Sequence, residues 1–261
     1  MQWGFKIMTI YYTISFLILG TIMGSFFNVV GDRLPNNKSI IYPPSHCENC
    51  NHRLGVLELI PIFSFLLQGG KCKNCKIKLS IIYPLYELCC GVAYATCYLK
   101  FGLTFELLYA LTFISVLLII IISDCNYYII SDGVLIFGFL FLLIEKIFIF
   151  GSYEAFISVI DAVISFCGMF ALKLLGDFIF KKESMGGGDI KLMLIFGFVL
   201  GYKMALFSIV FGAIIGLPIS ILVLYIKKNR VVPFGPFLTL AALNIYLLGI
   251  TYESFINLLI K

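Results

Sequence analysis

The chain has 261 residues, of which 61% are hydrophobic and only 13% are charged. Soluble domains carry about 25% charged residues, and a large core cannot account for such a deficit, so the composition excludes an ordinary soluble domain. The formal net charge is +5, but the basic residues are not interleaved with aromatic residues on a soluble face, so we expect no nucleic-acid partner.

Long apolar runs organise the chain. A bilayer core about 30 Å thick requires roughly 20 mostly apolar residues per helix. The first run, residues 7–30, is longer than the apolar part of a signal peptide, so we expect a retained membrane helix. Seven more spans are predicted at 83–99, 104–123, 132–150, 155–175, 189–201, 203–226 and 234–256. The sequence therefore predicts an all-α polytopic membrane protein with about eight transmembrane helices.

Residues 31–82 differ from the rest in composition. They contain seven of the 19 Lys and Arg residues, both histidines and four of the eight prolines. This composition predicts a water-facing insertion between a first transmembrane helix, residues 1–30, and a multi-helix membrane domain, residues 83–261.

The distribution of basic residues predicts the orientation. If the insertion faces the cytoplasm, alternation of the spans places the loops at 124–131, 177–188 and 227–233 on the same side. Six more basic residues lie in or beside those loops: Lys181, Lys182, Lys191, Lys227, Lys228 and Arg230. With the seven of the insertion, 13 of the 19 basic residues then face or border the cytoplasm, as the positive-inside rule requires.

Two C-x-x-C pairs in the insertion give the clearest metal signal. Cys47 and Cys50 form the first pair, and Cys72 and Cys75 form the second. Two such pairs complete a tetrahedral sulfur site, which favours zinc, and four protein ligands leave no open position, so the metal should be structural. Four unligated thiols remain the alternative. His46 and His52 flank the first pair, and we expect them to be loop residues that face solvent.

Two aspartates lie at the ends of apolar spans on the same predicted membrane face. Asp124 directly follows the span 104–123, at a depth where an ionisable group is costly and suggests a functional site. Asp189 follows three glycines, which allow close backbone approach and open the next helix. Taken singly, each has a plain alternative: Asp124 as an interfacial helix cap, and the glycine run as a flexible linker with Asp189 as its N-cap.

Together the two carboxylates point to chemistry. Two acids in a low-dielectric site share a proton, so an ionised Asp124 or Asp189 can activate water while its protonated partner polarises a carbonyl. This combination predicts peptide hydrolysis. Among the other acids, we expect Asp132 to cap a helix start and Glu87 to bind a polar partner within the fold.

Six ordered blocks resemble the bacterial type IV prepilin peptidases, a family of GxGD-type intramembrane aspartyl proteases. The blocks are Gly24–Val30 with Arg33–Pro35, Pro44–Cys47, Gly70–Cys72 with Tyr83–Leu88, the Asp124 segment, Gly186–Leu192 and Val232–Phe237. The chain departs from the family at Ser131, where Pro is frequent, and at Gly31 and Asp32, where an aromatic and an aliphatic residue are usual.

The resemblance implies an enzyme of the bacterial cytoplasmic membrane whose active site faces the cytoplasm. Its substrates would be prepilins or pseudopilins, and it would lie in the lipid bilayer. Asp124 and Asp189 would be the catalytic residues that cleave the leader. Many relatives carry the cysteine tetrad and also methylate the new N-terminal residue with S-adenosylmethionine. The sequence leaves that second activity open, because no glycine-rich cofactor loop on a strand–helix unit is visible.

The sequence also admits two other classes of function. An ion transporter or channel would use the intramembrane acids to carry ions, but no inverted repeat or pair of broken helices is visible. A zinc-scaffolded partner protein without chemistry would keep its full function after replacement of both Asp124 and Asp189.

Overall fold

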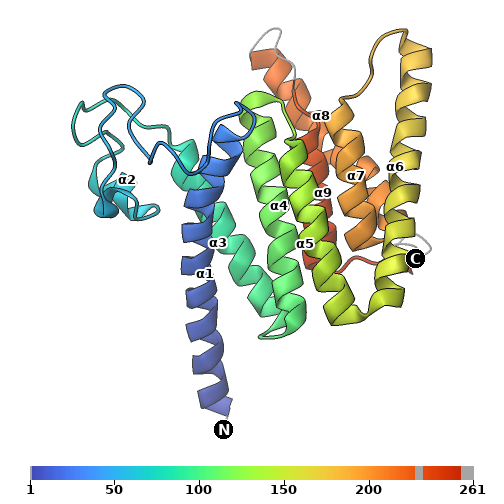
Figure 1. The fold of residues 1–261 in the computed structure, drawn as a ribbon, viewed down its shortest axis with the longest axis horizontal. Helices are drawn as coiled ribbons and strands as arrows, with labels where there is room; N and C mark the ends of the chain where they lie inside the picture. Colours follow the sequence, from blue (N-terminus) through green and yellow to red (C-terminus); the bar gives the residue numbers. More distant parts are fainter. Residues whose placement is uncertain (1, 227–231, 254–261) are drawn as a thin grey trace. The chain divides into compact units, whose positions relative to one another are not determined.

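The computed structural model describes residues 2–226 and 232–253, and these residues form helices and loops without any strand. The longer helices are α1 (Gln2–Arg33), α3 (Ile82–Phe101), α4 (Phe105–Tyr127), α5 (Asp132–Phe150), α6 (Ser152–Phe180), α7 (Gly187–Leu200), α8 (Tyr202–Ile226) and α9 (Gly235–Leu248). A 3-10 turn η1 (Val56–Glu58) and the short helix α2 (Phe63–Leu67) lie between α1 and α3. The all-α prediction is confirmed, and each predicted span corresponds to one longer helix (Figure 1).

Not all of these helices have the length of a membrane span. Within the described ranges, five are long and apolar enough to cross a bilayer: α1, α4, α5, α6 and α8. Helix α7 has 14 residues, or about 21 Å, which is shorter than a bilayer core. Helix α9 ends at Leu248, well before the predicted limit at residue 256. The basic loop residues Lys227, Lys228 and Arg230 lie outside the described residues.

The chain divides into two compact units, Met1–Ile122 and Ser123–Lys261, so the boundary falls inside α4. In the first unit, α1 and α3 pack side by side over much of their lengths (Figure 1). Small residues allow this approach: a Cβ on Gly20 would lie 2.6 Å from the carbonyl oxygen of Cys90, and a Cβ on Gly91 would lie 2.7 Å from Cγ2 of Thr21. Close packing through glycine is a frequent way to join helices in a membrane.

Helix α7 is the most enclosed element of the second unit. It packs against α5, α6, α8 and α9, and the side chains of Leu192, Met193, Phe196 and Phe198 are fully buried. A helix that is apolar on all sides is stable only when neighbours surround it. This position explains how so short a helix is held, and it fixes the place of Asp189 in its first turn.

Candidate active site and metal centre

Asp124 lies in the last turn of α4 and is only 5% exposed. The chain then folds back on itself. The N–H of Tyr128 donates to the carbonyl of Asp124 at 3.0 Å, Tyr128 has a φ of +60°, and the hydroxyl of Ser123 donates to the carbonyl of Ile129. Asp124 therefore sits at the carboxyl end of its helix within a hydrogen-bonded turn, which excludes a role as an N-cap.

Asp189 is brought to the site by the glycine run. Helix α7 begins at Gly187, and Asp189 occupies its first turn with 9% exposure. A Cβ on Gly188 would lie 3.0 Å from Cβ of Ile130, in the turn that follows α4. A side chain at residue 188 would press on this turn, so Gly188 is a packing contact between α7 and the turn, whereas a Cβ on Gly187 would meet nothing within 4 Å.

The two carboxylates meet over the start of α9. A Cβ placed on Gly235 would lie 3.1 Å from Oδ1 of Asp189 and would overlap Oδ2 of Asp124. The side chains of Asp124 and Asp189 therefore face the same point of backbone, although 65 positions separate them in the sequence. The amino-terminal ends of α7 and α9 lie here, and their partial positive charge favours carboxylates in a buried site.

Asp132 has a different role from the predicted one. Ser131 is the N-cap position of α5, and Asp132 is its first helical residue. The Asp132 carboxylate binds the Nζ of Lys191 at 2.7 and 2.9 Å. The expectation that Asp132 lies at a helix start is confirmed, but Ser131 holds the N-cap position and the Asp132 carboxylate pairs with Lys191 on α7 instead.

The candidate metal centre is built from two repeats of one hairpin. In the first, the N–H of Cys47 donates to the carbonyl of His52 at 2.9 Å, and in the second the N–H of Cys72 donates to that of Ile77 at 2.9 Å. The N–H of Leu54 donates to the carbonyl of Ser45 at 2.9 Å, and the N–H of Leu79 donates to the carbonyl of Gly70 at 2.8 Å. Both hairpins turn through a residue with positive φ, at Asn51 and Lys76.

The sulfur atoms of the hairpins fit a tetrahedral metal ion. The four Sγ atoms of Cys47, Cys50, Cys72 and Cys75 lie within 4.8 Å of one another. The distance is 3.8 Å from Cys47 to Cys75 and 3.9 Å from Cys50 to Cys72. Zinc–sulfur bonds of about 2.3 Å place tetrahedral ligands about 3.8 Å apart. The cluster can therefore hold a metal ion.

The surroundings favour thiolates at this centre. The backbone N–H of Ile77, followed by the side chain of Asn49, lowers the pKa of Cys75 to about 6. The amide of Asn74 lies 3.7 Å from the sulfur of Cys50. Because metals bind the thiolate and not the thiol, such donors around the sulfur atoms assist binding.

Neither histidine is part of the sulfur cluster. Nδ1 of His46 lies 2.9 Å from the carbonyl oxygen of Pro44, and Nε2 of His52 lies 3.1 Å from Oε2 of Glu58. Both therefore have partners elsewhere in the loop. Glu87 does bind within the fold, as expected: its Oε2 accepts the N–H of Ile62 at 2.7 Å.

Comparison with known proteins identifies the family. Residues 18–101 match the model of the bacterial peptidase A24 N-terminal domain, and residues 111–221 match that of the type IV leader peptidase family. The chain is 36% identical to the prepilin leader peptidase/N-methyltransferase of Bacillus subtilis (strain 168), over 91% of this chain and 95% of that protein. The chain belongs to the type IV leader peptidase family. The resemblance in the sequence is thereby confirmed.

Other type IV leader peptidases are more distant. The proteins of the same name from Legionella pneumophila and Stutzerimonas stutzeri are 32% and 29% identical, with 76% and 86% of their lengths covered. These matches include 84% and 86% of the residues of this chain, respectively. No solved structure matches the chain. Asp124 and Asp189 both fall within the part matched by the leader peptidase model, and the cysteine cluster falls within the N-terminal domain.

Proposed function

We propose that this protein removes the leader peptide from type IV prepilins or pseudopilins, and that Asp124 and Asp189 carry out the hydrolysis. The observation that carries this proposal is the convergence of both carboxylates on the backbone of Gly235. Both side chains are largely buried. Membership of the family and the names of the relatives support the choice of substrate.

The proposed mechanism uses one shared proton. Two carboxylates this close, in a site of low dielectric, cannot both ionise easily. The ionised aspartate takes a proton from water, whose oxygen attacks the peptide carbonyl carbon, while the protonated aspartate donates to the carbonyl oxygen. When the tetrahedral diol collapses, the C–N bond breaks and the aspartate that took the water proton donates it to the leaving amine. A hydroxyl of the diol returns its proton to the other aspartate as the new carboxyl group forms. The dyad thereby returns to its singly protonated state.

The proposal also includes a compartment and a metal. The charge distribution supports an active site at the cytoplasmic face of a bacterial membrane, because most basic residues fall in loops on that side. Zinc is the proposed ion at the four cysteines, where it would hold the two hairpins of the insertion together.

N-methylation of the new amino terminus is the second proposed activity. The relatives named above are prepilin leader peptidase/N-methyltransferases. S-adenosylmethionine would supply the methyl group when bound. The transfer breaks its S–CH₃ bond, forms an N–CH₃ bond and releases one proton from the amine.

The test is processing of a prepilin by the purified full chain in lipid. The wild type should release the leader, and mass spectrometry should find the mature N-terminus. Asp124→Asn and Asp189→Asn should each lower the cleavage rate by about a thousandfold while the helices remain folded. Glu183→Gln removes an exposed carboxylate near α7 and serves as the control. Appreciable cleavage by either aspartate variant would exclude the dyad.

A further inference from the structure

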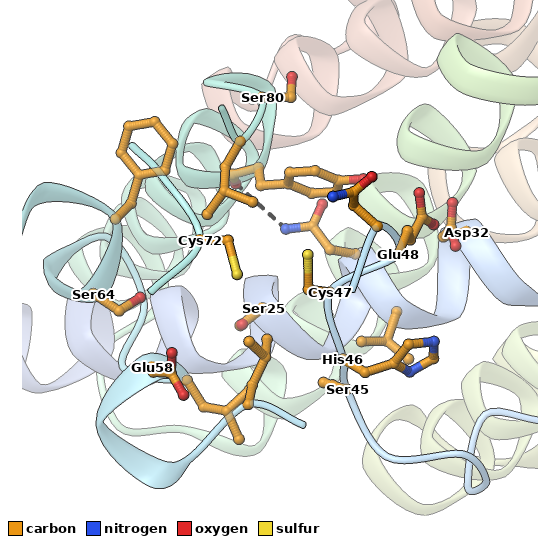
Figure 2. Close-up of a pocket in the computed structure, with 18 of the residues that line it drawn as sticks. Ser25, Asp32, Ser45, His46, Cys47, Glu48, Glu58, Ser64, Cys72 and Ser80 are labelled. Carbon is orange, nitrogen blue, oxygen red and sulfur yellow. Dashed lines mark hydrogen bonds between the residues drawn. The ribbon is translucent and has the colours of Figure 1, made fainter. Parts of the chain in front are cut away.

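The first unit contains a large cavity that the proposed peptidase chemistry does not use. It has a volume of about 1040 Å³, at the upper end of the range for small-molecule sites. Its walls come from the end of α1, the cysteine insertion and the start of α3. Glu58 and Ser64 lie on one side and Asp32 and Glu48 on the other, with Ser25 between them (Figure 2).

Two buried acceptors in the cavity wall lack a hydrogen-bond donor. Oδ1 of Asn28 and Oε1 of Glu58 are buried without a partner. The other polar atoms of these side chains are occupied, because Nδ2 of Asn28 donates to the carbonyl of Tyr83 at 3.3 Å and Oε2 of Glu58 accepts the N–H of Gly55 at 2.9 Å. A buried acceptor without a donor is costly, so these two atoms point to a ligand that carries donors.

The charges in the wall define the ligand further. Glu58 is 10% exposed, and the N–H of Gly55 lowers the pKa of its carboxyl, so it is an anion at neutral pH. Acids and bases both line the cavity: Asp32, Glu48, Glu58 and Glu87, with Arg33, Lys38 and Lys78. The rings of Tyr42, Phe65 and Tyr83 also line it. The site therefore suits a small molecule with positive centres, a carboxylate and a flat ring.

We propose that this cavity binds S-adenosylmethionine, and that Glu58 and Asn28 are binding residues for it. The inference rests on the methylation proposed above. The cofactor carries a sulfonium, an ammonium, a carboxylate and an adenine, which correspond to the acids, bases and aromatic rings of the wall. Its amino groups and hydroxyls supply the donors that Asn28 and Glu58 lack. A carboxylate beside a cation in a shielded site contributes more to affinity than one in open water.

The basic leader of a prepilin is the competing occupant. Lysine and arginine side chains would also pair with the acids of the wall. The cofactor is favoured because the unpartnered oxygens of Asn28 and Glu58 are shielded from bulk water, whereas an extended peptide needs a groove open along its length. A synthetic leader peptide therefore belongs in the experiment as a second probe.

Binding to the zinc-loaded full chain in lipid nanodiscs tests the proposal. Titration calorimetry with S-adenosylmethionine should give saturable binding to the wild type. Glu58→Gln keeps an oxygen for the amide of Gly55 but removes the charge, and should weaken binding about tenfold or more. Glu106→Gln makes the same change on an exposed residue outside the cavity and should leave affinity unchanged. Elemental analysis of zinc in each variant shows whether the insertion remains intact.

Photolabelling gives a readout that needs no variant. Irradiation with radiolabelled S-adenosylmethionine, followed by digestion, should place the label on peptides within residues 25–87. Label in the second unit would overturn the proposal, as would wild-type affinity in Glu58→Gln. The proposal would also be overturned if Glu58→Gln weakened binding of the leader peptide but left binding of S-adenosylmethionine unchanged. If any of these results is found but the protein still methylates pilins, only the assignment of this cavity as the cofactor site is wrong. If the cofactor neither binds nor transfers its methyl group, the methylation proposal fails as well.

Discussion

The Nζ of Lys191 lies 2.7 and 2.9 Å from the two carboxylate oxygens of Asp132 and joins the start of α7 to the start of α5. Lys191 follows Asp189 by two residues, and Asp132 follows the turn that contains Ile130. The ion pair therefore connects the segments that carry the two proposed catalytic aspartates. Both side chains are about half exposed, so the pair should stabilise the fold by less than about 1 kcal/mol.

The first prediction concerns this pair. Asp132→Asn should lower leader cleavage by about tenfold through small displacement of α7, while thermal stability changes little. The swapped variant Asp132→Lys with Lys191→Asp restores an opposite-charge pair and should recover part of the activity. Cleavage rates and melting temperatures measured on the same preparations decide the matter. If the swap is no better than Lys191→Asp alone, the pair does not position the site.

The second prediction concerns Gly235. Gly235→Ala should lower cleavage by about a hundredfold or more, because its methyl group would overlap Oδ2 of Asp124 and approach Asp189. Gly187→Ala is the matched control, because a Cβ there meets nothing within 4 Å. Both variants should retain the helical circular dichroism of the wild type. Equal activity of the two variants would contradict the arrangement of the site.

The third prediction concerns the metal. Purified protein should contain about one zinc per chain. Cys47→Ser with Cys50→Ser should abolish it and raise amide hydrogen exchange at Leu54 and Leu79, whose N–H groups close the two hairpins. Amides within α7 should keep their protection. Freshly prepared wild-type protein without metal, or equal loss of protection in α7, would contradict a local structural role.

The fourth prediction concerns protons released on zinc binding. The pKa of Cys75 is lowered to about 6, so this thiol is already ionised at pH 7.5 in the metal-free chain. Zinc should then displace at most about three protons from the four cysteines. Below pH 6 Cys75 is protonated, and its own proton should be released as well. Calorimetry in buffers of different ionisation enthalpy measures the number of protons released when zinc binds. Release of four protons at pH 7.5 would contradict the lowered pKa of Cys75.

Much of the architecture could be predicted from the sequence, because long apolar runs report membrane helices directly. The repeat of the metal hairpins also had a signal, the shared pattern Cys-x-Asn-Cys-x-x-basic-Leu from Cys47 to Leu54 and from Cys72 to Leu79. Comparison of the two loops residue by residue would have found it. The repeat is only eight residues long, so it does not stand out as a long internal repeat.

Contacts between distant segments could not be predicted in the same way. Asp132 resembles a helix cap, because aspartate is frequent at helix starts and its partner Lys191 lies 59 residues away. Gly235 lies in the block Val232–Phe237 that resembles the family, but its contact with the two acids becomes visible only after folding, since no local pattern says which glycine two acids approach. The central place of α7 depends on four neighbouring helices, whereas hydropathy describes each segment by itself.

The missing side chain at Gly235 has a consequence for how the gene can vary. Any other amino acid at this position adds at least one carbon atom beside the two acids, so conservative replacement does not exist there. A saturation library selected for prepilin processing should retain only glycine at residue 235 but several residues at position 187. Random mutation can thus inactivate the enzyme through a change that no hydropathy or charge scale registers.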